Sequence, residues 1–217
     1  ENQTGIGTIT ATDDDGDTLS FSLSGTDASS MSINSSSGVL VFNSAPDYET
    51  KTSYSATVTA SDGTNSTTQD ITITITDIDD TAPVFTSSAS FSAAENQTSI
   101  GTVTATDVDT DNASITFSIS GSELSITSGG VLTFASTPDY ETKSSYSATV
   151  TASDGTNSST QDITVTVTNV NDNSPVFTSG AAFSVVENQT GIGTITATDD
   201  DGDTLSFSLS GTDASSM

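Results

Sequence analysis

Hydrophobic and polar residues alternate along several stretches of the chain. In residues 163–168 and 71–76 every second residue is Ile or Val, and each residue between them is Thr. Residues 115–119 and 146–152 alternate in the same way. Successive side chains of a β-strand point to opposite faces, so a period of two predicts strands with one buried face and one face in water. No stretch shows a sustained helical period.

Turn-forming sequences separate these strands, for example at residues 14–17, 128–130 and 154–157. In the central part of the chain we predict strands at residues 84–92, 100–106, 114–120, 123–127, 131–135, 145–153 and 160–168. About seven short antiparallel strands in roughly 92 residues are typical of a two-sheet Greek-key sandwich. The predicted fold class is therefore all-β.

The chain consists of internal repeats. Residues 1–31 and 187–217 are identical, and a related copy begins at Glu95. The unit is about 92–94 residues long, which suits one sandwich domain. We predict three domains: a repeat lacking its first strand at 1–82, a complete repeat at 83–174, and the beginning of a third repeat at 175–217. We interpret the chain as a segment of a longer array; the alternative is that neighbouring chains complete the partial repeats by strand exchange.

Composition excludes several classes of function. The chain has two basic residues against 29 acidic ones, a net charge of −27. Two basic side chains can neutralise very few phosphate charges, so nucleic acids and anionic membrane surfaces are disfavoured as partners. The absence of Cys and His excludes disulfides, zinc sites of the usual kind and His-based acid–base catalysis. No apolar run reaches the ~18 residues of a membrane span, so we expect no direct membrane insertion.

The acidic residues gather near the predicted strand ends. Each repeat has an acidic residue before the second strand, a pair after it, an Asp-Tyr-Glu triplet and an acidic segment at the junction with the next repeat. Two like charges about 4 Å apart repel by roughly 4 kcal/mol at an effective dielectric constant of about 20. A hard divalent cation would relieve that repulsion. Calcium, which takes 6–8 oxygen ligands, suits this set better than zinc, copper or magnesium.

Five motifs in order resemble those of cadherin repeats. They are Glu95 in AENQ, Asp107-Val-Asp109, Asp139-Tyr-Glu141, the Asp154 that follows Thr-Ala-Ser, and the NDNSP segment at 171–175. The set is most similar to cadherin-like domains of large bacterial surface proteins. The resemblance implies tandem seven-stranded Greek-key β-sandwiches (cadherin/Ig-like) in a linear array, with about three calcium ions at each complete interdomain junction.

The resemblance also implies which residues bind calcium at each junction. At the first complete junction they are Glu1, Asp47, Glu49, Asp77, the Ile78 carbonyl, Asp79, Asp80, the Thr81 carbonyl, Asp107, Asp109, the Asn112 carbonyl and Asp154. At the second they are Glu95, Asp139, Glu141, Asn169, the Val170 carbonyl, Asn171, Asp172, the Asn173 carbonyl, Asp199, Asp201 and the Gly202 carbonyl. Asp13, Asp15 and Asp62 resemble the lower half of a further site.

Two of these positions depart from the family pattern. The first linker residue is Asn169 in one junction where the family has Asp, and Asp79 stands in the other junction where the family has Asn. The first change removes one negative charge and the second adds one. We therefore expect the two junctions to differ in calcium affinity.

The predicted function is that of a calcium-rigidified extracellular structural or adhesive array, which acts as a stiff spacer or filament. Its partners would be calcium and neighbouring repeats, with self-association into fibres. The alternative is a carbohydrate- or protein-binding adhesion module that uses the sandwich faces or loops. We do not expect an enzyme, because a glycosidase-like carboxylate pair is seldom repeated in every domain and Ser has no His to activate it. The expected location is extracellular or at the cell surface, secreted and bacterial.

Overall fold

The structure, a computed structural model, describes residues 1–109 and 114–214. The chain forms two compact units, which we describe separately. The first contains Glu1–Ala82 and the described part of Asp107–Ser114, and the second contains Pro83–Thr106 and the described part of Ile115–Met217. Nearly all regular structure is β-strand, as the alternation predicts. No helix among the described residues is long and apolar enough to cross a membrane.

The first unit contains two three-stranded antiparallel sheets. One has the order β1-β4-β3 and the other the order β2-β5-β6. A 3-10 turn, η1, precedes β3. The bounds are β1 Gly5–Thr8, β2 Ser20–Ser24, η1 Ala28–Ser30, β3 Met31–Ile33, β4 Val39–Phe42, β5 Ser53–Ser61 and β6 Ser66–Thr74.

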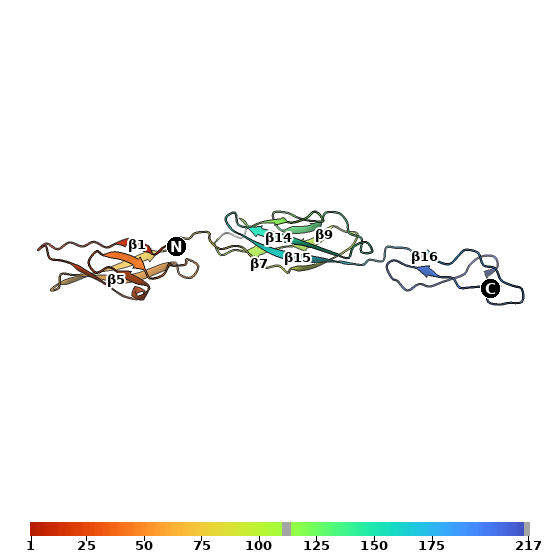
Figure 1. The fold of residues 1–217 in the computed structure, drawn as a ribbon, viewed down its shortest axis with the longest axis horizontal. Helices are drawn as coiled ribbons and strands as arrows, with labels where there is room; N and C mark the ends of the chain where they lie inside the picture. The colour runs from red at the N-terminus through yellow and green to blue at the C-terminus, as the bar shows by residue number, and fades with distance from the viewer. Residues whose placement is uncertain (110–113, 215–217) are drawn as a thin grey trace. The chain divides into compact units, whose positions relative to one another are not determined.

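The second unit contains a four-stranded sheet, β11-β14-β15-β8, and a three-stranded sheet, β12-β13-β9. Figure 1 shows the long strands β14 and β15 side by side, and they pair antiparallel along nine residues of β14. Two small sheets, β10-β7 and β16-β17, complete the unit. The bounds are β7 Val84–Phe85, β8 Ser90–Ala94, β9 Ser99–Thr102, β10 Ala105–Thr106, β11 Thr116–Ile119, β12 Leu124–Ile126, β13 Val131–Phe134, β14 Ser145–Ser153, β15 Ser158–Thr168, β16 Val176–Phe177 and β17 Ala197–Thr198.

The core of the second unit follows the predicted alternation. On β15 the side chains of Ile163, Val165 and Val167 are buried, whereas the Thr residues between them are exposed. They pack with Leu132 of β13 and Val150 of β14, so both sheets contribute to one core. Because Thr is a good strand residue and keeps the outer face hydrated, the sandwich needs few charged side chains on its sheets.

The predicted strand at 84–92 was wrong in one respect, because the chain divides it in two. β7 pairs antiparallel with β10, whereas β8 pairs in parallel with β15. The predicted strand at 100–106 is likewise divided, into β9, which pairs with β13, and β10. Each division lets one segment of chain contribute to two sheets, and a local alternation of residues carries no signal of such a crossover.

Each unit has a turn at an equivalent position that contains a glycine with positive φ. Gly130 and Gly38 both have positive φ, +87° and +69°, and their carbonyls accept hydrogen bonds from the N–H groups of Val103 and Ile9. A Cβ at either glycine would lie 2.2 Å from the carbonyl oxygen of that same partner. The turn therefore excludes any side chain, both by backbone conformation and by space.

Replacing Gly130 tests how much the second unit depends on this turn. We expect Gly130→Ala to lower the free energy of unfolding by more than about 1 kcal/mol, because the alanine is strained at positive φ and its Cβ meets Val103. Gly129→Ala is the matched control, since its Cβ would find only the Thr127 hydroxyl, 4.0 Å away. Urea unfolding of both variants measures the difference; equal losses would show that the turn is not constrained.

Candidate metal centres

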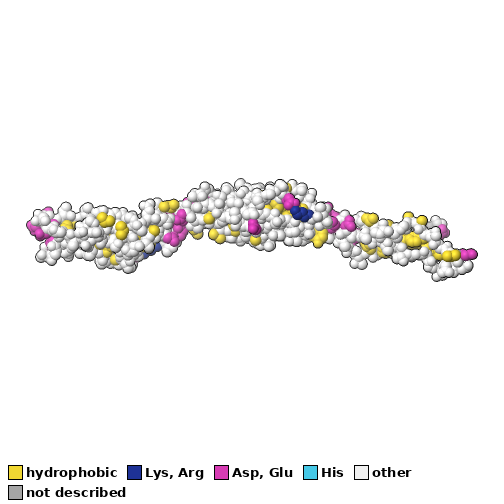
Figure 2. Space-filling model, in the orientation of Figure 1, with side chains coloured by type: hydrophobic (Ala, Val, Ile, Leu, Met, Phe, Trp, Pro, Cys, Tyr) yellow, Lys and Arg dark blue, Asp and Glu magenta, His cyan; other side chains and the backbone are white. Residues whose placement is uncertain are grey.

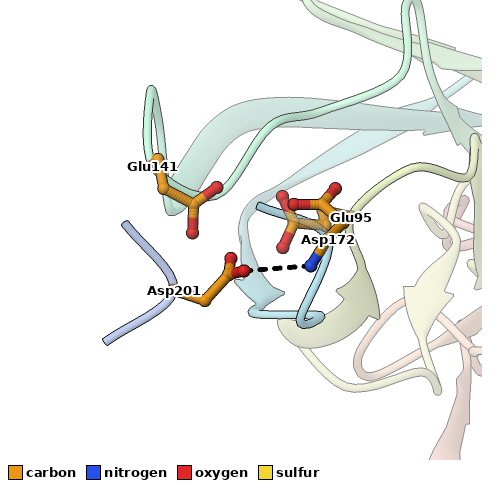
Figure 3. Close-up of side chains that lie close together, drawn as sticks. All are labelled: Glu95, Glu141, Asp172 and Asp201. Atoms are coloured by element: carbon orange, nitrogen blue, oxygen red, sulfur yellow. Dashed lines mark hydrogen bonds between the residues drawn. The ribbon is translucent and has the colours of Figure 1, made fainter. Parts of the chain in front are cut away.

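Four carboxylates converge near the C-terminal end of β15. Glu95 follows β8, Glu141 lies between β13 and β14, Asp172 follows β15, and Asp201 follows β17. One oxygen from each lies within 4.8 Å of the others. Figure 3 shows the four side chains pointing toward one another, with a hydrogen bond from the main-chain N–H of Asp172 to Asp201. Three separate parts of the repeat and the following segment thus contribute to one acidic centre.

Glu95 is the most buried member of the group, with an exposed fraction of 3%. Its Oε2 accepts a hydrogen bond from the Tyr140 N–H at 2.7 Å, and its Oε1 accepts one from the Val170 N–H at 2.7 Å. Hydrogen bonds from backbone N–H groups stabilise a buried carboxylate in its charged form. Glu95 therefore fixes the Asp-Tyr-Glu loop and the linker in position while it contributes its own charge.

Glu1 has the same arrangement in the first unit. Its Oε2 accepts the Tyr48 N–H at 2.6 Å and its Oε1 accepts the Ile78 N–H at 2.9 Å. Glu1, Asp47 and Glu49 form one carboxylate group, and Glu49, Asp80 and Asp109 form another that shares Glu49. Five acidic residues of the predicted first junction therefore lie in two adjoining groups.

Asp109 and Asp201 anchor the linkers in the two units. Asp109 Oδ2 accepts the N–H groups of Asp80 and Thr81, at 3.0 and 2.6 Å. Asp201 Oδ2 accepts the equivalent N–H groups of Asp172 and Asn173, at 3.0 and 2.7 Å. These bonds join each linker to the Asp-x-Asp segment that follows the next pair of strands.

Sequence reasoning missed two contributors. The residue after each buried Glu is Asn in the left-handed region, with φ of 58° at Asn2 and 64° at Asn96. Their side-chain amides donate to Asp80 and Asp172, which orients those carboxylates. Asp203 was also missed, and it groups with Asp199 and Asp201. The threefold Glu-Asn-Gln and the continued spacing by two in Asp199, Asp201 and Asp203 were the available signals.

Other predicted ligands lie outside these groups of described carboxylates. Asp139 uses its oxygens to accept hydrogen bonds from the N–H and hydroxyl of Thr142. Asp47, which does belong to a group, accepts the equivalent bonds from Thr50. Asp154 Oδ1 accepts the N–H groups of Thr156 and Asn157, and Asp62 does the same in the first unit. The remaining acidic predictions outside the groups are Asp13, Asp15, Asp77, Asp79 and Asp107. The Asn112 carbonyl lies outside the described residues.

The acidic groups shift each other's pKa values. The hydrogen bond from its own backbone N–H lowers the pKa of Glu49, but desolvation and the nearby carboxylates of Asp109 and Glu1 outweigh it and raise the pKa to about 7. Desolvation and the carboxylates of Asp109 and Glu1 also raise the pKa of Asp77. Asp109 shows the opposite outcome, because hydrogen bonds from Thr81 and Asp80 overcome desolvation and lower its pKa.

The second junction repeats this pattern. Desolvation and the charges of Glu95, Asp201 and Asp139 raise the pKa of Glu141, against the effect of its own backbone N–H. At Asp201 desolvation also raises the pKa, but hydrogen bonds from Asn173 and Asp172 outweigh it, so the pKa of Asp201 is lowered. Each junction therefore holds at least one carboxyl group whose charge is poorly compensated beside one whose charge is well compensated by hydrogen-bond donors.

The two basic side chains are engaged elsewhere. Lys51 forms an ion pair with Asp27 and lies 4.6 Å from the centre of the Tyr54 ring. Lys143 forms an ion pair with Glu123 and lies 4.5 Å from the centre of the Tyr146 ring. On the face shown in Figure 2, acidic side chains occupy separate patches, with broad areas of neither charged nor hydrophobic atoms between them. The acidic centres are therefore not neutralised by the basic side chains of the chain.

The fold and the acidic centres define a class of module, a two-sheet β-sandwich with carboxylates gathered at its junctions. Residues 88–168 match the family profile of the cadherin domain, so the chain contains a cadherin domain. The chain is also homologous to animal protocadherins. It is 36% identical over 207 residues to human protocadherin Fat 4 and 31% identical over 199 residues to human protocadherin-15. These alignments cover 87% and 86% of this chain but only 4% and 10% of the relatives.

Solved structures give the same assignment of fold. Mouse cadherin-23 EC22–24 matches with a TM-score of 0.70 and 28% identity, over 92% of this chain and 73% of that chain. Protocadherin gamma B2 extracellular cadherin domains 3–6 match with a TM-score of 0.68 and 26% identity, over 84% and 51% of the two chains. The cadherin resemblance read from the motifs is thus confirmed. Its bacterial setting is not supported by these findings, since the relatives named here are animal proteins.

The raised pKa of Glu49 predicts how stability depends on pH without metal. The folded protein holds a proton on Glu49 up to about pH 7, whereas the unfolded chain releases it near 4.5. The unfolding free energy should therefore fall as pH rises from about 4.5 to about 7. The lowered pKa values of Asp47, Asp62 and Asp109 act only below about 3.8, outside this window.

Thermal unfolding in chelator across this pH range tests that dependence. Glu49→Gln should flatten the fall, because the neutral amide has no proton to lose. Asp70→Asn, on the exposed face of β6, is the control and should keep the slope of the parent. An unchanged slope in Glu49→Gln would contradict the raised pKa.

Proposed function

We propose that the acidic centres bind calcium, and that the chain is part of an extracellular structural or adhesive array whose junctions calcium stiffens. The observation that carries this proposal is the convergence of Glu95, Glu141, Asp172 and Asp201 within 4.8 Å. These side chains come from three parts of one repeat and from the segment that follows it. A cation bound among them would join all of these parts.

Electrostatics favours a divalent cation at this place. Carboxylates at such distances repel, and both lysines are paired with other side chains. The available donors are all oxygen atoms, since the chain has no His or Cys. Asp154, a predicted ligand of the first junction and not of this centre, has a buried Oδ2 with no hydrogen-bond donor among the described residues, so it too could accept a cation. A set of this kind fits calcium, which binds 6–8 oxygens at 2.3–2.6 Å.

The residues that would hold calcium follow from the two units. In the second unit they are Glu95, Glu141, Asp172, Asp199, Asp201 and Asp203, with the carbonyls of Val170, Asn173 and Gly202. In the first they are Glu1, Glu49, Asp80 and Asp109, with Asp47, Asp77, Asp79 and Asp107 around them. Bound calcium supplies positive charge that replaces repulsion with shared ligation. The number of ions per junction, about three, stays a prediction from the family resemblance.

Calcium binding would stabilise the folded chain as well as its junctions. A ligand that binds only the folded state at 100 times its dissociation constant contributes about 2.7 kcal/mol per site. Extracellular calcium modules bind at about 10⁻⁴–10⁻³ M, so such sites fill outside cells and empty inside them. The repeat limits 1–82, 83–174 and 175–217 belong to this proposal, since each acidic centre would mark a domain junction.

The sheet surfaces favour a spacer over a recognition module. On β14 and β15 the outward residues are almost all Ser and Thr, paired across the strands, as in Ser147 with Thr164 and Thr151 with Thr160. The equivalent pairs recur on β5 and β6. Such a face offers no aromatic platform and no charge pattern for a specific partner. We therefore assign partner contacts to calcium and to neighbouring repeats.

Calcium titration of the whole chain by calorimetry tests this function. We expect several ions to bind, and the melting temperature to rise with calcium and fall with chelator. Glu141→Gln should weaken binding at the second junction because it removes one converging carboxylate whose charge is poorly compensated. Asp162→Asn is the control; it removes the same charge from β15, where the Thr149 hydroxyl donates to Asp162 at 2.7 Å.

The control separates specific binding from general charge. If both variants lose the same affinity, calcium acts only as a diffuse counterion and the proposed sites are wrong. If the parent chain binds no calcium and its melting temperature does not respond, the function itself fails.

A further inference from the structure

The residue that follows each Glu of the repeated Glu-Asn-Gln-Thr sequence has a backbone conformation that favours glycine. Among the described residues, the non-glycine residues with positive φ are Asn2, Asn96 and Asn188, with φ of 58°, 64° and 66°. Glycine adopts this left-handed region at no steric cost, whereas a residue with a Cβ is disfavoured there. A turn that needed only this backbone conformation would be better served by glycine. The asparagine side chain must therefore contribute something that glycine lacks.

The backbone of this asparagine is bound to the loop that carries the Asp-Tyr-Glu triplet. The Asn96 N–H donates to the Pro138 carbonyl at 3.1 Å, and the Asn2 N–H donates to the Pro46 carbonyl at 3.1 Å. Each proline directly precedes its triplet. Since the preceding glutamate accepts an N–H from the same loop, two hydrogen bonds hold the Glu-Asn pair against that loop in each unit.

The side-chain amide of the asparagine reaches the linker instead. Asn96 Nδ2 donates to Asp172 Oδ2, and Asn2 Nδ2 donates to Asp80 Oδ2. Each pair lies within one compact unit, so the contact occurs twice at equivalent places. The partners are 76 and 78 residues apart in the sequence. The contact is therefore a feature of the repeat and not of one local surface.

The acceptor of this bond belongs to the acidic centre. Asp172 contributes an oxygen to the group that it forms with Glu95, Glu141 and Asp201. Its other oxygen, Oδ1, accepts a hydrogen bond from Asn173 Nδ2 at 2.9 Å. Two amide donors thus restrict the rotation of this carboxylate, while each oxygen keeps a further lone pair for a cation.

A neutral donor suits this place better than a basic side chain. A hydrogen bond from an amide to an ionised carboxylate compensates part of its negative charge and fixes its orientation. A lysine would form a similar bond, but its positive charge would repel a cation bound nearby. The amide therefore orients the carboxylate without competing with a metal ion.

We propose that Asn96 is a positioning residue of the candidate metal centre, which holds the Asp172 carboxylate in the orientation for calcium, and that Asn2 does the same for Asp80. The proposal rests on the proposed function, since it takes the acidic centre to bind calcium. The Asn96 side chain acts through Asp172 and does not itself touch the ion. Removing a group that orients a metal ligand typically lowers the affinity for the metal by about 10–100-fold.

Calorimetric titration of the whole chain with calcium tests this role. Asn96→Gly removes the donor and keeps the left-handed backbone without strain. We expect this variant to bind calcium at this centre about tenfold more weakly than the parent chain. Gln97→Ala is the matched control, because it removes an exposed primary amide from the next residue, and its affinity should equal that of the parent.

A double-mutant cycle shows whether Asn96 acts through Asp172. In the Asp172→Ala background the acceptor is absent, so Asn96→Gly should cause no further loss of calcium affinity. If Asn96→Gly weakens binding by the same factor in both backgrounds, it acts by another route and the positioning role is wrong.

A charged substitution separates a positioning donor from a direct ligand. Asn96→Asp keeps the size of the side chain, but an ionised carboxylate cannot donate a hydrogen bond. Because the new charge would repel Asp172, we expect the affinity for calcium to fall at least as far as in Asn96→Gly. A direct ligand would behave in the opposite way, so an affinity that is retained or raised in Asn96→Asp contradicts the proposal.

NMR of the chain in chelator gives a readout that needs no metal. The side-chain amide signals of Asn96 are identified by their loss in Asn96→Gly. They should exchange with water more slowly than those of the exposed Gln97, and Asp172→Ala should remove this difference. Equal exchange of the two amides in the parent chain would show that the bond to Asp172 is not formed, which rules out the positioning role.

The outcomes separate this proposal from the proposed function. If the parent chain binds calcium and Asn96→Gly binds it equally well, the positioning role is overturned and the calcium function stands. If the parent chain binds no calcium, the calcium function fails and the positioning role fails with it, even where NMR shows the bond between Asn96 and Asp172.

Discussion

The repulsion among carboxylates that have no basic side chains to neutralise them is the constraint on which the rest of the structure depends. The chain places Glu95, Glu141, Asp172 and Asp201 together, although its two lysines are engaged with Asp27 and Glu123. Such an arrangement persists only if other donors hold each carboxylate. The buried Glu95 is held by the N–H groups of Tyr140 and Val170, and Asp201 by those of Asp172 and Asn173. The backbone that positions the charges therefore also compensates them in part, and a cation would supply the remainder.

The sandwich itself is built so that this concentration of charge stays at its junctions. The sheet faces are covered with Ser and Thr, which pair across strands β14 and β15 and between β5 and β6. The buried side is purely apolar in its tightest part, where Leu132, Val150 and Ile163 have no exposed surface. Charge can therefore vary at the junctions with little effect on the packing of each repeat.

Much of this fold is readable from the sequence because alternation reports burial directly. The residues of β14 and β15 were predicted as strands, since every second side chain there faces the core. The division of residues 84–92 into β7 and β8 was not predictable, because it depends on pairing with β10 and β15 and not on local pattern. In the site, Glu95 and Asp201 were predicted as ligands from the resemblance to cadherin repeats. The amide donors at Asn96, Asn169 and Asn171 were not recognised as donors, since a sequence shows that a side chain has an amide but not which way its N–H groups point.

The repeats are nearly identical in sequence, whereas the linkers between them differ. Residues 1–31 and 187–217 are identical, so the parts that build the sandwich hardly change from copy to copy. The linkers change at three of the positions that face the acidic segment, each time replacing an acceptor or hydroxyl by an amide. Both linkers retain the backbone bonds to Asp109 or Asp201, so this attachment does not depend on the linker side chains. A repeated domain can therefore vary the side chains at its acidic centres without any change to its fold, because these side chains belong to a short segment outside the core.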